Sequence, residues 1–332
     1  MKTIVTGGAG FIGSHLVEKL LDFGYEVRVV DNLSTGQFSN LSAVSGNSNF
    51  EFHQVDLVDF ESVQAAFKGV DIVFHLGALA DIVPSIQHPL AYFHANVHGT
   101  SNVLEAARAV NVSRLIYAAS SSCYGIPDVY PTSEAEPVRA QYPYALTKYL
   151  GEELVLHWGK VYGLSVASLR LFNVYGPRAR TSGTYGAVFG VFLAQKLAGK
   201  PFTVIGDGTQ VRDFTYVSDV VNALISAARS EEAVGGVLNV GSGIPHSINQ
   251  LVTLLDGEVT YIPRRPGEPD CTWANIEKIR NTLGWKPQVS FEQGVAQMLA
   301  NIEYWREAPV WDPESIRAAS VDWFKYLGKK HG

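Results

Sequence analysis

The chain has 332 residues, of which 46% are hydrophobic, and its formal net charge is −6. This length allows one large or two medium domains, while the small acidic excess argues against nucleic-acid binding, which needs clustered basic residues. No apolar run reaches membrane-spanning length, so we expect no membrane partner. Cys123 and Cys271 lie far apart and in no metal-ligand spacing, so we expect no metal site and a reducing, cytoplasmic compartment.

The first predicted strand, residues 3–6, runs directly into a glycine-rich turn that is followed by an amphipathic helix. The turn over residues 7–13 fits G-x-G-x-x-G, and also a variant that begins one residue earlier. Glycine permits a tight turn and a close approach of backbone to a pyrophosphate, and the next helix N-terminus attracts negative charge. We therefore predict dinucleotide binding rather than an ordinary glycine turn. The candidate residues are Gly7, Gly10, Phe11, Ile12 and Gly13.

The second predicted strand, residues 26–30, ends at Asp31, which lies 18 residues after Gly13. This spacing is close to the ~20 residues expected for the acid that binds the adenosine ribose hydroxyls. A carboxylate there would repel a 2′-phosphate, so NAD is favoured over NADP. The alternative is a solvated turn aspartate, since turn-forming residues follow it. Neighbouring cofactor candidates are Asn32, Ser34 and Gly36.

Further strands are predicted at residues 50–55, 71–76, 114–119 and 165–171, separated by helical patterns. Nearly continuous apolar strands that alternate with helices indicate an α/β fold with a doubly wound parallel sheet. Ligands of such sheets bind beyond the carboxyl ends of the strands. We therefore expect one crevice to collect Asp56, Gly77, Ala78, Ser120, Ser121, Ser122 and Asn173.

The pattern changes after residue 176, where Gly and Pro separate shorter elements. We expect a Rossmann domain over residues 1–176 and a smaller, mixed substrate-binding lobe over 177–332, with segments near 212–242 returning to the sheet. Near the end, Asp312 and Pro313 predict a helix start. Its predicted buried stripe, interpreted as packing, is Ile316, Ala319, Trp323, Phe324 and Leu327.

Tyr144 and Lys148 are spaced i and i+4, on one face of a predicted helix. A phenol titrates at about 10, too high for a base at neutral pH. A nearby ammonium and a positively charged nicotinamide would lower that pKa and make the phenol a usable general base. The serines at 120–122 could instead satisfy turn backbone. We favour catalysis because nucleotide loop, hydroxyls and Tyr/Lys pair follow in the order such sites use.

These motifs together resemble the extended short-chain dehydrogenase/reductase family, specifically its NAD-dependent nucleotide-sugar epimerase/dehydratase branch. The resemblance covers nearly the whole chain. The matching positions are 7–13, 31, 56–57, 75–78, 96, 120–125, 144, 148, 173–177, 212–214, 239–243 and 265–268.

The resemblance implies a mechanism in which Tyr144 removes the proton from the sugar O4 while hydride passes from C4 to NAD+. Ser120 would hydrogen-bond O4, and Lys148 would hold the nicotinamide ribose. The remaining cofactor residues implied are Asp56 and Leu57 at adenine, with Leu76, Gly77, Ala78 and Asn96.

The implied substrate residues are Ser121, Ser122, Asn173, Arg212, Arg265 and Thr272. Guanidinium groups suit diphosphate oxygens, although Arg212 beside Asp213 leaves a surface salt bridge as an alternative. Thr272 would lie near the sugar 2-substituent, where its small side chain favours an N-acetyl group, unless Trp273 closes the same space.

Dehydratases of this branch usually carry Asp-Glu directly after the catalytic Ser/Thr, where this chain has Ser121 and Ser122. We therefore favour a 4-epimerase that inverts C4 of a UDP-hexose or UDP-N-acetylhexosamine through a transient 4-keto sugar. A 4,6-dehydratase is the runner-up. A catalytically inactive nucleotide-binding protein is the alternative of another class. The resemblance also implies a homodimer through helices near 96–110 and 144–160.

Overall fold

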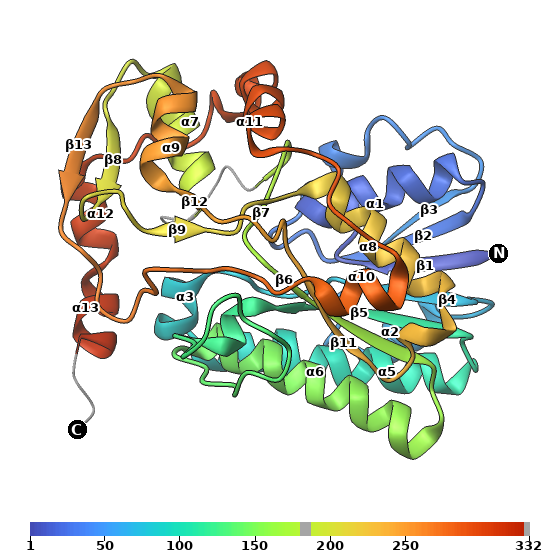
Figure 1. The fold of residues 1–332 in the computed structure, drawn as a ribbon. Helices are drawn as coiled ribbons and strands as arrows, with labels where there is room; N and C mark the ends of the chain where they lie inside the picture. The colour runs from blue at the N-terminus through green and yellow to red at the C-terminus, as the bar shows by residue number, and fades with distance from the viewer. Residues whose placement is uncertain (180–186, 329–332) are drawn as a thin grey trace.

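The computed structural model describes residues 1–179 and 187–328, and its centre is a seven-stranded parallel sheet in the order β11-β6-β5-β4-β1-β2-β3 (Figure 1). Each of the six strands predicted from the sequence is present, with both ends within one residue of the prediction. The doubly wound α/β fold is therefore confirmed. The strands are β1 (Lys2–Thr6), β2 (Glu26–Asp31), β3 (Phe50–Gln54), β4 (Ile72–His75), β5 (Arg114–Ser120), β6 (Val166–Leu171) and β11 (Val237–Val240).

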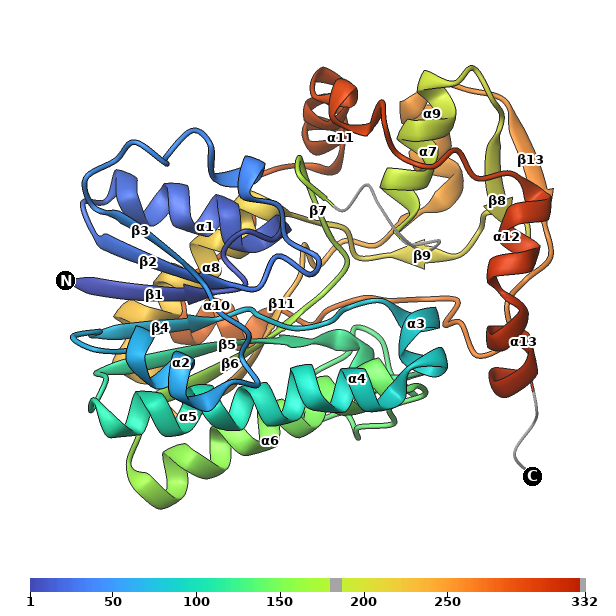
Figure 2. The same cartoon turned by 180° about the vertical axis from the view of Figure 1, so that it is seen from behind.

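Helices cover both faces of this sheet, which explains why its strands are apolar at almost every position (Figures 1 and 2). On one face, Val5 and Val29 pack with Leu16 of α1 and Leu224 of α8. On the other, Ile4 and Val30 belong to the cluster of α2, α5 and α6. The helices are α1 (Phe11–Asp22), α2 (Phe60–Ala66), α5 (Gly99–Ala109), α6 (Pro143–Tyr162) and α8 (Val217–Arg229), with α10 (Glu277–Leu283) beside β11.

A smaller lobe with short mixed sheets lies at the carboxyl edge of the large sheet (Figure 1). Its core is aromatic, since Phe214 stacks on Phe291 and Phe189 on Tyr175. Its strand pairs are β7 (Val174–Tyr175) with β10 (Thr215–Tyr216), β8 (Phe202–Ile205) with β13 (Val259–Ile262), and β9 (Val211–Arg212) with β12 (His246–Ser247). Its helices include α7 (Val188–Leu197), α9 (Ile248–Leu255) and α11 (Phe291–Ala300).

The C-terminal segment forms two helices, α12 (Pro313–Ala319) and α13 (Val321–Leu327), where the sequence predicted one. Asp312 caps the first helix as predicted, because its Oδ1 accepts a 2.8 Å hydrogen bond from the backbone of Ser315. The predicted stripe is wrong at Phe324, which is 42% exposed, whereas Ile316 and Trp323 are buried. The break at Ser320 shifts the helical phase and turns Phe324 outward.

In the two described parts of the chain, no helix combines the length and apolar composition that crossing a bilayer requires.

Candidate active site

A cavity of about 740 Å³ lies beyond the carboxyl ends of the sheet strands and extends into the smaller lobe. It brings together nearly all the residues that the sequence analysis selected from distant positions. The predicted residues lining it are Gly7, Gly10, Phe11, Ile12, Gly13, Asp31, Asn32, Ser34, Asp56, Leu57, Leu76, Gly77, Ala78, Ser120, Ser121, Ser122, Tyr144, Lys148, Asn173, Arg212, Arg265 and Thr272.

The glycine turn forms the floor of one end of the cavity. Gly7 has a φ of +68°, and a Cβ on Gly13 would lie 2.2 Å from the carbonyl oxygen of Gly7. Larger residues are therefore excluded at both positions. Gly10 precedes α1 without a side-chain cap, so the first N–H groups of this helix remain available to an anion.

Asp31 ends β2, lines the cavity and is hydrogen-bonded to the glycine turn. Its Oδ2 accepts a 3.0 Å hydrogen bond from the Ala9 N–H, and its Oδ1 accepts one from Leu33. It is only 8% exposed, so it is not a solvated turn residue, and burial raises the pKa of its carboxyl. Asn32 donates to Asp56 across 3.0 Å, which joins the ends of two strands. These carboxylates suit ribose hydroxyls.

Gly36 and Asn96, two of the predicted cofactor residues, are not among the described residues that line the cavity. A Cβ on Gly36 would lie 2.9 Å from the Asp31 carboxylate, so this glycine leaves room for Asp31. Asn96 is buried in a π-helical turn, where it bonds both backbone groups of Leu79 and donates to Thr147. Asn96 therefore supports the cavity wall from behind.

The hydroxyl groups predicted for catalysis come from two neighbouring elements. Ser120 ends β5, and Tyr144 and Lys148 lie one turn apart at the start of α6. Ser120 lines the cavity with Tyr144 and interacts with its hydroxyl, and its Oγ lies 2.8 Å from that of Ser122. It also accepts the Ser122 N–H at 3.2 Å, so it satisfies the turn backbone as well.

Burial governs the protonation of the Tyr/Lys pair. It raises the pKa of Tyr144, an effect that the hydrogen bond from Ser120 opposes. It lowers the pKa of Lys148 to about 7, opposed by the negative charge of Glu152. The lowering of the Tyr144 pKa that the spacing predicted is therefore not produced by this chain alone. A further positive charge in the cavity would lower it.

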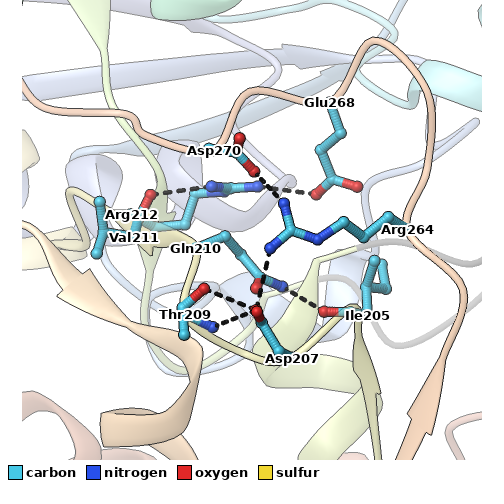
Figure 3. A network of polar contacts seen from close by, with 9 residues as sticks. All are labelled: Ile205, Asp207, Thr209, Gln210, Val211, Arg212, Arg264, Glu268 and Asp270. Carbon is cyan, nitrogen blue, oxygen red and sulfur yellow. Dashed lines mark hydrogen bonds and ion pairs between the residues drawn. The ribbon is translucent and has the colours of Figure 1, made fainter.

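Arg212 occupies the opposite end of the cavity, on β9, and is 8% exposed. Its guanidinium donates to Glu268 across 2.9 Å, and Figure 3 shows the two side chains pointing toward each other. Arg212 therefore does form a salt bridge, as the alternative held, but the pair is part-buried and the partner is Glu268 rather than Asp213. Asp213 is fully buried and accepts the backbone N–H groups of Gly243 and Ala274 instead.

Thr272 and Asn173 line the cavity together, since the Thr272 hydroxyl donates to the Asn173 side-chain oxygen across 2.6 Å. Trp273 does not close this space. Its indole donates to the Gly243 carbonyl at 2.9 Å, and it is absent from the cavity lining in residues 1–179 and 187–328.

The NAD dependent epimerase/dehydratase family model matches residues 3–241. The chain belongs to this family. This membership makes the protein an NAD-dependent enzyme, and the glycine turn, Asp31 and Lys148 are residues that suit that cofactor.

Three solved structures resemble this epimerase/dehydratase family member over nearly its whole length. UDP-glucose 4-epimerase of Thermotoga maritima, solved with UDP-glucose, is 36% identical with a TM-score of 0.85, covering 92% of this chain and 99% of that one. UDP-N-acetylglucosamine 4-epimerase of Methanobrevibacter ruminantium, solved with UDP-N-acetylmuramic acid, is 34% identical with a TM-score of 0.85, covering 91% and 97%. UDP-glucuronic acid 4-epimerase of Bacillus cereus, solved with UDP-glucuronic acid and NAD, is 32% identical with a TM-score of 0.85, covering 91% and 99%.

Several residues of this family member's cavity were missed by the sequence analysis. Tyr142 lies two residues before Tyr144, so its position in the sequence already indicated that it could line the same cavity. Glu268 lies within a motif that matched the family, but only the arginine of that motif was selected. The C-terminal tryptophans had no signal, because their sequence pattern is that of ordinary packing. The missed residues include Tyr142, Gln210, Glu268, Trp311 and Trp323.

Proposed function

We propose that this protein is a UDP-sugar 4-epimerase. The observation that carries the proposal is that Ser120, Tyr144 and Lys148 line one cavity, flanked there by the neutral side chains of Ser121 and Ser122. Elimination of water needs an acid and a base beside the reacting carbons, and these two serines supply neither. Moving a proton on and off a single sugar oxygen requires only the phenol and its hydroxyl partner.

In the proposed reaction, Tyr144 accepts the proton of the sugar O4 and later returns it, while Ser120 holds O4 by a hydrogen bond. Bound NAD+ supplies the hydride acceptor, and its reduced form the donor. Arg212 and Arg265 line the far end of the cavity, where their guanidinium groups would bind the diphosphate with paired hydrogen bonds. The nucleotide is then held while the sugar turns, so that both faces of C4 meet the same catalytic pair.

We infer that N-acetylhexosamines are accepted as well as hexoses. Thr272 is a small cavity-lining side chain held by Asn173, and Trp273 points away toward Gly243. A tyrosine at position 272 would fill that space. Thr272→Tyr is therefore expected to abolish turnover of UDP-N-acetylglucosamine while retaining turnover of UDP-glucose.

The test is incubation of the purified protein with UDP-glucose and with UDP-N-acetylglucosamine, followed by NMR of the products. A 4-epimer supports the proposal. Loss of the C6 hydroxyl would show a dehydratase, and no turnover of any UDP-sugar would favour a binding protein. If Thr272→Tyr loses turnover of both substrates equally, Thr272 does not lie at the sugar 2-substituent. That result would leave the proposed 4-epimerase activity standing.

We also propose a homodimer formed through α5 and α6, which lie side by side on one outer face of the protein (Figure 2). Exposed apolar side chains follow α6, with Leu146 47%, Val161 53% and Tyr162 51% exposed. Light scattering on the eluting peak of a sizing column measures the mass directly, and a monomer at micromolar concentration would contradict this proposal.

A further inference from the structure

We propose that the C-terminal helix α13 forms part of the wall of the substrate cavity. Its Trp323 is a positioning residue for the loop that holds the substrate's diphosphate. That loop, residues 263–268, carries Arg265, so the inference rests on the proposed function. Trp323 comes from the C-terminal segment, which the sequence analysis interpreted only as packing. In the structure its side chain is 4% exposed and lines the cavity.

Trp323 contacts the diphosphate loop in two ways at once. Its indole N–H donates a 2.7 Å hydrogen bond to the carbonyl oxygen of Pro266. Its ring lies under the guanidinium of Arg265, with 5.4 Å between the guanidinium carbon and the ring centroid. One side chain therefore holds both the main chain of the loop and the cation that faces the cavity.

The same indole also reaches the catalytic side of the cavity. Its ring centroid lies 6.2 Å from that of Tyr142, the residue that precedes α6. Tyr142 in turn stacks on Tyr144, with 6.4 Å between centroids and 8° between the rings. Trp323 therefore contacts both the diphosphate loop and Tyr142, the neighbour of the proposed catalytic phenol.

Helix α13 contacts a helix of the sheet domain and not the smaller lobe alone. It packs against α3 (Ile82–Gln87), where Asp322 accepts a 2.8 Å hydrogen bond from Gln87. Ile82 and Val83 of α3 line the same cavity. Figures 1 and 2 both show α12 and α13 running from the smaller lobe down to the level of α3. The helix pair therefore bridges the two sides of the substrate cavity.

The other flank of the loop is held by ion pairs, which Figure 3 shows. Arg264 bonds Asp207 at 3.1 Å and Asp270 at 2.9 Å, but its side chain is 54% exposed and both carboxylates are more so. Exposed pairs of this kind contribute little, because water and salt screen them. The buried contacts of Trp323 therefore hold the loop together with the part-buried Arg212–Glu268 pair, and they are contacts that reach Arg265 itself.

The test compares Trp323→Ala and Trp323→Phe with Phe324→Ala, a matched control because Phe324 is the exposed neighbour on the same helix. Calorimetry on the NAD-bound protein measures the affinity for UDP, and kinetics give kcat and KM for the UDP-sugar. Trp323→Ala is expected to weaken UDP binding about tenfold, which corresponds to about 1.4 kcal/mol. KM should rise in parallel, with kcat at saturating substrate and NAD content little changed.

Trp323→Phe keeps an aromatic ring beneath Arg265 but loses the bond to Pro266, so it should fall between wild type and Trp323→Ala. Phe324→Ala should match wild type. If Trp323→Ala does not fold, the UDP affinity of Trp323→Phe decides the question. Unchanged UDP affinity in the folded Trp323 variants would overturn this inference but not the proposed function. The same holds if UDP affinity falls only where the bound NAD is also lost. A wild-type protein that does not bind UDP would overturn the proposed function itself.

Discussion

Replacing Lys148 by methionine is expected to stabilise the cofactor-free protein while abolishing its activity. Lys148 is 4% exposed, and burial lowers its pKa from 10.5 to about 7. At 1.36 kcal/mol per pKa unit, keeping this ammonium charged costs about 5 kcal/mol at pH values below 7. Methionine avoids that cost but loses the contact of the ammonium with the Tyr117 ring, at 4.2 Å from the centroid, worth about 1–2 kcal/mol.

The gain has a defined pH dependence. Between about pH 7 and pH 10.5 the unfolded chain keeps the Lys148 proton that the folded chain has released, so wild-type stability rises with pH over this window. The variant lacks this contribution, and its advantage is therefore largest below pH 7 and disappears toward pH 10.5. A net gain of about 3 kcal/mol, with an unfolding entropy of about 0.7 kcal/mol/K for 332 residues, raises Tm by about 4 °C.

Thermal unfolding of cofactor-depleted protein at about pH 6 and about pH 9 measures both the size and the sign of the effect. Lys160→Met is the matched control, because Lys160 is exposed on the same helix. The reasoning is refuted if Lys148→Met is less stable than wild type at the lower pH, or if the difference in Tm is the same at both pH values.

Three further substitutions test other parts of the site. Tyr144→Phe should lower kcat by about 10²–10⁴ with NAD still bound, because it removes the proposed proton acceptor, and a turnover assay with cofactor quantification checks this. Asp31→Ala should weaken NAD binding by about 1–3 kcal/mol, because it removes the acceptor of two backbone N–H groups and of the ribose hydroxyls. A fluorescence titration with NAD measures this affinity, and an unchanged value would leave Asp31 with a structural role only. The Glu152 carboxylate lies 2.6 Å from the Arg170 guanidinium, so Glu152→Gln leaves that guanidinium buried without its charge partner. A denaturant titration should show a free energy of unfolding lower by about 3–5 kcal/mol. Glu153→Gln is the control, because Glu153 is exposed and its replacement should not have this effect.

The sheet and the cofactor end of the cavity could be predicted because their determinants are local. Apolar runs such as residues 114–119 mark strands that are buried on both faces. The turn after β1 and the acid that ends β2 lie at strand ends, and parallel topology brings such ends to one edge. Residues far apart in the sequence therefore converge without any knowledge of side-chain packing.

The substrate end depended on contacts between distant loops, which a sequence pattern does not reveal. Arg212 pairs with Glu268, 56 positions away, rather than with its neighbour Asp213. Trp323 reaches Pro266 and Arg265 only because α13 folds back across the cavity. The predicted stripe gave Trp323 only a packing role, because the sequence does not show which loop this helix contacts.

The protonation of the catalytic pair was the other property that spacing did not determine. An i, i+4 interval places Tyr144 and Lys148 near each other, but the sign of each pKa shift depends on how much water the fold removes. Burial disfavours both phenolate and ammonium, so without a further charge the phenol keeps its proton. A positive charge in the cavity favours the phenolate, and so does a protonated Lys148. For Tyr144 as the proposed base, binding of a positively charged cofactor and activation of the phenol would thus be coupled.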